Sequence, residues 1–128
     1  MAYSFRIDTA QGVVLFKGAE IFSISDILNC LEEIEADPAF KPEFGHLVDM
    51  REVTNFEPSS TEIRIRAYRD RGSAKLDASR IAIVASSDLV YALSRMYATL
   101  MEDASASVRA FKDMNKAREW LGLPPEQS

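Results

Sequence analysis

The chain is poor in the residues that build disulfide frameworks and metal centres. Its 128 residues include one cysteine and one histidine. A single cysteine excludes an internal disulfide. One cysteine and one histidine are also too few ligands for a multi-cysteine zinc or iron–sulfur site. We therefore expect neither a metal site nor a cofactor.

Long hydrophobic runs and an excess of positive charge are also missing. No stretch approaches the roughly 20 apolar residues that span a bilayer, and no basic stretch followed by an apolar run marks a signal peptide at the N-terminus. The net charge of −5 argues against a general nucleic-acid binder. These features predict a cytoplasmic protein with no membrane and no nucleic-acid partner.

The length of the chain and the position of its prolines indicate one domain. We expect it to cover residues 1–123, followed by a loose C-terminal tail at 124–128 that begins with two prolines. Apolar segments of strand type occur at 3–7, 13–16, 46–50, 80–85 and 107–111. Gly18 is expected to close the second strand, and residues 51–58 to form a connection.

Helical periodicity fills the intervals between these strands. Each helix is expected to begin at a capping side chain, namely Ser23, Ser59, Ser86 or Ser87, and Asp113. The resulting order is ββαβαβαβα. Strands separated by helices form right-handed crossovers, so we predict an α/β fold whose mixed sheet has a parallel core.

Motifs for catalysis are not found in the sequence. It has no Gly-x-Gly-x-x-Gly, no phosphate-binding P-loop and no Gly-x-Ser-x-Gly. We therefore predict that the chain is not an enzyme.

Several segments, in their order and spacing, carry a resemblance to a known family. They are Ala36–Pro42, Leu47–Thr54, Arg80–Val84, Ser94–Tyr97, Val108–Phe111 and Ala117–Gly122. Together they resemble the STAS superfamily, and in particular the stand-alone bacterial anti-sigma-factor-antagonist-like domains of uncharacterised function. The resemblance implies the stage II sporulation antagonist-like fold and a non-enzymatic regulatory or protein-interaction module.

Members of that family that act as antagonists are switched by phosphorylation. A kinase modifies a serine in an Asp-Ser-Ser-Gly-like turn after the third strand. The corresponding stretch here places Ser59 or Ser60 near that serine, but it lacks the glycine and contains Pro58. The resemblance thus makes Ser59 and Ser60 candidate switch residues.

A second interpretation of the same region is an anion site at the carboxyl ends of the parallel strands, where helix N-termini offer N–H groups. Its candidate residues are Asp49, Arg51, Ser59, Ser60, Ser86 and Ser87. The alternative is that the serines are ordinary helix caps.

The charges are unevenly distributed along the chain. Residues 18–40 contain six acidic residues and no lysine or arginine, whereas residues 64–80 contain six basic and two acidic residues. Such patches could join two copies of the chain or steer a protein partner, so we predict a homodimer. The candidate partner surface is formed by Arg64, Arg66, Arg69 and Arg71, and the alternative is two solvated helix faces.

Aromatic residues suggest a further alternative function. Such side chains could line an apolar pocket or fill the core; they are Phe40, Phe44, Phe56, Tyr68, Tyr91 and Tyr97. Cys30 lies on an apolar helix stripe and is expected to be a buried, inert thiol. The alternative to an interaction module is therefore a small carrier or sensor of an anionic or lipid-like ligand.

Overall fold

The computed structural model describes residues 2–76 and 79–126. This part of the chain has the predicted order ββαβαβαβα. The strands are β1 (Tyr3–Asp8), β2 (Val13–Phe22), β3 (Gly45–Phe56), β4 (Arg80–Val84) and β5 (Ser107–Phe111). The helices are α1 (Ile24–Ala36), α2 (Ser60–Arg71), α3 (Asp88–Leu100) and α4 (Met114–Trp120), with a short 3-10 turn at Ala74–Leu76.

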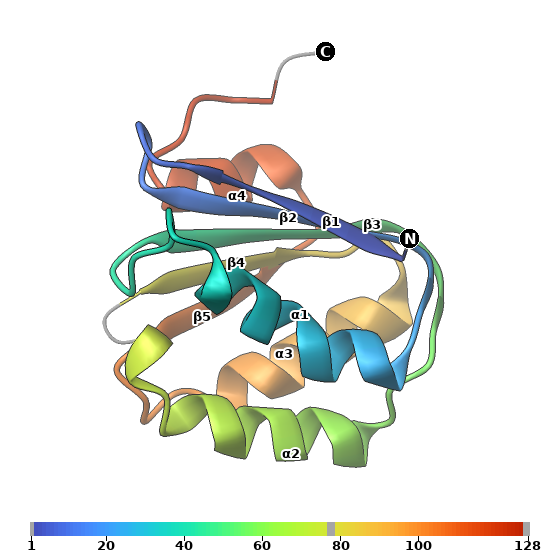
Figure 1. Ribbon diagram of the computed structural model, residues 1–128. Coiled ribbons are helices and arrows are strands. Elements are labelled where there is room, and N and C mark those ends of the chain that lie inside the picture. The colour runs from blue at the N-terminus through green and yellow to red at the C-terminus, as the bar shows by residue number, and fades with distance from the viewer. Residues whose placement is uncertain (1, 77–78, 127–128) are drawn as a thin grey trace.

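The strands form one mixed sheet in the order β1-β2-β3-β4-β5. β1 pairs antiparallel with β2, and β2 to β5 are parallel to one another. Three crossovers step across the sheet in the same direction, and crossovers share one hand, so their helices lie on one face. Figure 1 shows α1, α2 and α3 below the sheet and α4 above it. The predicted mixed sheet with a parallel core is confirmed.

The alternation of side chains along the strands divides the core between the two faces. On β3, Val48 and Met50 pack in the clusters on the side of α1, α2 and α3. Leu47 points the other way and packs with Met114 and Ala117 of α4. Neighbouring residues of one strand therefore serve different halves of the core.

Two strands are longer than their apolar runs predicted. β2 continues past Gly18 to Phe22, and β3 includes most of the predicted connection, ending at Phe56. The two extensions pair with each other up to Phe22 and Phe56, with register shifts that surround Glu20. Backbone hydrogen bonding thus continues the ladder through polar residues that hydrophobic alternation alone does not mark as strand.

The predicted helix starts are confirmed at all four helices. The N-cap residues are Ser23, Ser59, Ser87 and Asp113, and each side chain accepts a hydrogen bond from a backbone N–H in the first turn. Ser23 and Ser59 form complete capping boxes with Asp26 and Glu62.

Candidate ligand-binding cavity

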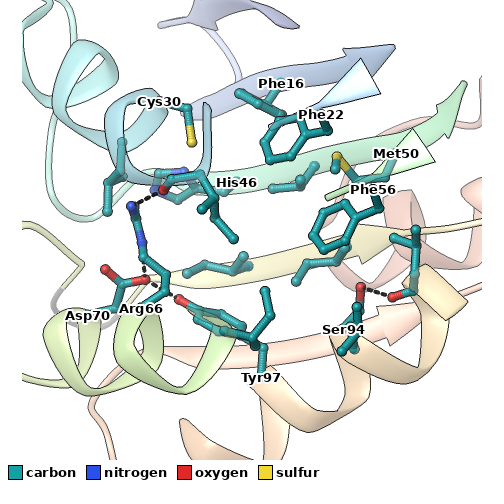
Figure 2. A pocket seen from close by; sticks show the side chains of 18 of the residues that line it. Phe16, Phe22, Cys30, His46, Met50, Phe56, Arg66, Asp70, Ser94 and Tyr97 are labelled. Atoms are coloured by element: carbon teal, nitrogen blue, oxygen red, sulfur yellow. Dashed lines mark hydrogen bonds and ion pairs between the residues drawn. The ribbon is translucent and has the colours of Figure 1, made fainter. Parts of the chain in front are cut away.

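An apolar cavity of about 150 Å³ lies between the sheet and helices α1, α2 and α3. Figure 2 shows side chains from the sheet above it and from α2 and α3 below it. The strands contribute side chains that point to this face of the sheet, and the helices contribute their inward stripes. The cavity is a consequence of the three-helix layer, which packs on the sheet without filling the space beneath it.

The walls at one end of the cavity are aromatic. The rings of Phe22 and Phe56 stack with their centroids 5.6 Å apart and their planes at 2°, and Phe16 meets Phe22 edge-on at 6.2 Å. Phe22 and Phe56 are the last residues of the β2 and β3 extensions. Met50 lies beside them in Figure 2. The unexpected length of the two strands therefore supplies this aromatic wall.

The other end carries a buried ion pair. The Arg66 guanidinium donates from Nε to Asp70 Oδ2 at 2.9 Å, and the two side chains are only 8% and 4% exposed. Arg66 also donates to the carbonyl oxygen of Ile27, and the Tyr97 hydroxyl donates to Asp70 at 2.5 Å. Burial, together with the charge of Asp70, raises the pKa of Tyr97 well above its usual value. The positive charge of Arg66 is thus matched locally by Asp70.

His46 lines the cavity near this polar end (Figure 2). The residue is 4% exposed, and Phe40 packs against it with 6.0 Å between ring centroids. Its Nε2 atom is buried and has no hydrogen-bond partner among the residues that the structure describes. Burial lowers the pKa of His46 to about 4, so the ring is neutral at pH 7. An unpaired buried polar atom costs about 1–3 kcal/mol.

Two further polar side chains line the cavity. The Cys30 thiol is partly buried, and burial raises its pKa to about 11, so it is protonated at neutral pH. This agrees with the prediction of an unreactive thiol, because the thiolate is the nucleophile. The Ser94 hydroxyl donates to the carbonyl oxygen of Val90 at 2.7 Å and so has its own partner.

The predicted anion site is only partly assembled. Arg51 donates to both carboxylate oxygens of Asp49 at 2.9 Å and to Glu126 at 2.7 Å. Burial opposes ionisation of Asp49, but the hydrogen bonds and charge of Arg51 outweigh it and lower the pKa of Asp49. The Ser86 hydroxyl donates to the backbone carbonyl of Arg51 at 3.0 Å. The structure thus brings Asp49, Arg51 and Ser86 together, and two carboxylates already neutralise the arginine.

The remaining serines lie at the starts of helices α2 and α3. Ser59 and Ser87 cap α2 and α3. The Ser59 hydroxyl also donates to the Glu62 carboxylate at 2.7 Å. Ser60 is the exposed first residue of α2. All four serines weighed as ligands or switch residues, Ser59, Ser60, Ser86 and Ser87, are exposed.

The four arginines predicted to form a partner surface have different environments. Arg66 is buried in the cavity wall, which corrects its assignment to a surface. Arg69 pairs with Glu32 of α1 at 2.5 Å, and Arg71 lies 3.8 Å from Asp103. Arg64 is exposed. Glu32 of the acidic segment 18–40 is therefore paired with Arg69 of the basic segment 64–80 within the fold.

The aromatic residues proposed as pocket or core divide between the two roles. Phe56 and Tyr97 line the cavity, whereas Phe40, Phe44 and Tyr91 are core residues or pack against the core. Tyr68 is 68% exposed. The sequence did not predict that His46 or the Arg66–Asp70 pair would line a cavity. The one available signal was an arginine and an aspartate one turn apart on a helix with a weak apolar stripe.

The described ranges, 2–76 and 79–126, contain no group of three or more histidine, cysteine, aspartate or glutamate residues placed to hold a metal ion. Within the same ranges, no helix is long and apolar enough to span a bilayer.

Comparisons with known proteins identify the fold. No family model matches the sequence, and no curated protein matches it. A solved structure that the fold resembles is an uncharacterised protein from Shewanella loihica PV-4, described as belonging to the DUF3478 family with a SpoIIAA-like fold. The two are 18% identical, the match covers 94% of each chain, and the TM-score is 0.62. The chain therefore has a SpoIIAA-like fold, in agreement with the STAS-like architecture that the sequence predicted.

Proposed function

We propose that this chain is a non-enzymatic module that binds a small apolar molecule in the cavity, as a carrier or a sensor. The observation that carries the proposal is a cavity of about 150 Å³ whose walls are almost entirely apolar. An apolar cavity of about this volume binds benzene in a well-studied engineered protein. Apolar walls with a few polar groups are also the usual composition of small-molecule sites.

The chemistry of the lining supports binding over catalysis. Cys30 is held as a thiol and His46 as a neutral ring, and Arg66 and Asp70 neutralise each other. A nucleophile paired with a base is the minimum for covalent catalysis. The polar lining of this cavity instead consists of groups suited to orient a ligand.

A titration with toluene tests this proposal. We expect toluene to shift the methyl NMR resonances of Val90 and Leu93, which line the cavity, and not that of exposed Leu89. Ser94→Leu puts a larger side chain into the cavity and should abolish these shifts. Ala92→Leu, on the exposed face of α3, is the matched control and should leave them unchanged.

Mass spectrometry of the freshly purified protein provides an independent measurement. A co-purified small apolar molecule that is lost from Ser94→Leu supports the proposal. Toluene shifts that Ser94→Leu leaves intact, or no shift in any variant, contradict it.

We also propose that the chain is a protein-interaction module whose partner is a second copy of itself. Large apolar side chains are exposed on adjacent helices: Ile24 and Leu28 on α1, and Ile65 and Tyr68 on α2. Leu28 lies one helical turn before Glu32 on α1, and Ile65 lies one turn before Arg69 on α2. Glu32 and Arg69 form an ion pair that joins the two helices. Contiguous exposed apolar side chains are typical of interaction surfaces.

Sedimentation equilibrium tests this second proposal. The unmodified chain is expected to form a dimer at high micromolar concentration and low salt. Replacing both Ile65 and Tyr68 by serine should give a monomer, whereas replacing exposed Thr99 by serine should not. A monomeric unmodified chain under these conditions contradicts self-association. Phosphorylation at Ser60 remains a proposed form of regulation for such a surface.

A further inference from the structure

The polar groups around the cavity differ in whether their hydrogen-bonding capacity is used. Arg66 and Tyr97 both donate to Asp70, and Ser94 donates to a backbone carbonyl. His46 is the exception, because its buried Nε2 atom has no partner in the described part of the chain. Buried polar atoms are normally paired, so a single unpaired nitrogen at the wall of a cavity indicates where a ligand bonds.

The charge at this end of the cavity selects against an ionised ligand. Arg66 is occupied by Asp70 and by the backbone carbonyl of Ile27. A carboxylate entering the cavity would therefore share it with the buried charge of Asp70 and meet no unmatched positive charge. Burying an unpaired charge is far more costly than burying a neutral polar group. The recognised group is consequently neutral.

The size and walls of the cavity restrict the rest of the ligand. A volume of about 150 Å³ accommodates a single ring. The opposite end presents Phe16, Phe22 and Phe56, whose rings already adopt stacked and edge-on contacts with one another. A further aromatic ring extends this pattern favourably.

We propose that the cavity recognises a single-ring aromatic compound with one neutral hydroxyl group, a phenol, whose hydroxyl bonds to Nε2 of His46 and whose ring contacts the phenylalanines. The inference rests on the proposed ligand-binding function and names the ligand class. A hydroxyl suits a neutral imidazole because it donates to an unprotonated nitrogen and accepts from a protonated one. The hydroxyl and the ring thus match the two ends of the cavity.

Three probes of similar size separate the contributions: phenol, toluene and benzoate. We expect phenol to bind about tenfold more tightly than toluene, the ratio that one net hydrogen bond supports. Benzoate should not bind at neutral pH. His46→Leu should remove the preference for phenol while toluene still binds. Ala92→Leu, on the exposed face of α3 and outside the cavity lining, is the control and should keep the preference.

The outcomes distinguish this inference from the proposed function. If neither toluene nor phenol binds, both fail. If toluene and phenol bind equally, or if His46→Leu leaves their ratio unchanged, the inference fails and the proposed function stands. Benzoate binding more tightly than phenol also overturns it. Should His46→Leu not fold, the side-chain nitrogen resonances of His46 in the unmodified chain decide: phenol should shift them and toluene should not, and equal shifts overturn the proposal.

Discussion

Arg66 and Asp70 form an ion pair one helical turn apart on α2, with 2.9 Å between Nε and Oδ2, and both side chains are buried. The pair belongs to the wall of the cavity and not to the surface of the helix. It explains why α2 shows so weak an apolar stripe: two of its four buried residues are charged.

Removing one member of this pair should be strongly destabilising. Asp70→Ala leaves the guanidinium of Arg66 buried without its counter-charge, a change that costs about 3–5 kcal/mol. Urea denaturation measures the loss in the free energy of unfolding. The matched control is Asp103→Ala, which breaks the exposed contact with Arg71 and should change that free energy little.

The same pair allows a second check. Replacing both residues, as Arg66→Met with Asp70→Leu, removes both buried charges and should restore most of the stability lost in Asp70→Ala. Equal losses in Asp70→Ala and Asp103→Ala would contradict a buried pair at this position.

Gly18 should control the volume of the cavity through Met50. A Cβ atom at Gly18 would lie 2.8 Å from the sulfur of Met50, a flexible side chain that lines the cavity. Gly18→Ala is therefore expected to displace Met50, keep the fold and weaken toluene binding. Gly72→Ala, where the nearest atom is a backbone oxygen at 4.0 Å, is the control. Equal toluene affinity in the two variants would refute this role.

His46 should make stability depend on pH in a defined window. Burial lowers its pKa from 6.5 to about 4 in the folded state, so the unfolded chain takes up a proton first as the pH falls. The contribution of His46 to the free energy of unfolding is fully present above pH 6.5. About 3 kcal/mol of it is lost as the pH falls to about 4. The other ionisable groups lining the cavity are Arg66 and Asp70 on α2, Cys30 on α1 and Tyr97 on α3.

Denaturation curves at several pH values measure this effect. His46→Leu has no group that titrates at this position, so its stability should fall less between pH 6.5 and pH 4. Parallel losses in the two proteins would show that His46 does not titrate as its burial requires.

Ser59 and Ser60 are equivalent in the sequence but differ in the structure. The Ser59 hydroxyl donates to the Glu62 carboxylate. Ser59→Asp therefore places a second carboxylate beside that of Glu62, and the two negative charges repel each other. Ser60→Asp places a negative charge in the exposed first turn of α2, where the helix dipole favours it. We expect Ser59→Asp to lower the melting temperature and Ser60→Asp to leave it nearly unchanged. The reverse order in melting curves would contradict the capping geometry.

The sequence predicted those parts of the fold that local patterns encode. Short apolar runs and capping residues such as Ser23 and Asp113 gave the element order and the helix starts. The extensions to Phe22 and Phe56 were missed, because pairing between two strands maintains them and neither segment shows it alone. An apolar pocket was one alternative for the aromatic residues, and Phe56 and Tyr97 do line the cavity, but its position could not be predicted, since it arises from how three helices sit on the sheet. His46 therefore looked like an ordinary first residue of a strand.

The most direct test of the account is a crystal structure of the protein soaked with para-bromophenol. An anomalous bromine peak is expected inside the cavity, near Phe22 and Phe56, with the hydroxyl within hydrogen-bonding distance of His46 Nε2. A bromine peak only at the surface, or a cavity filled by protein side chains, would contradict it.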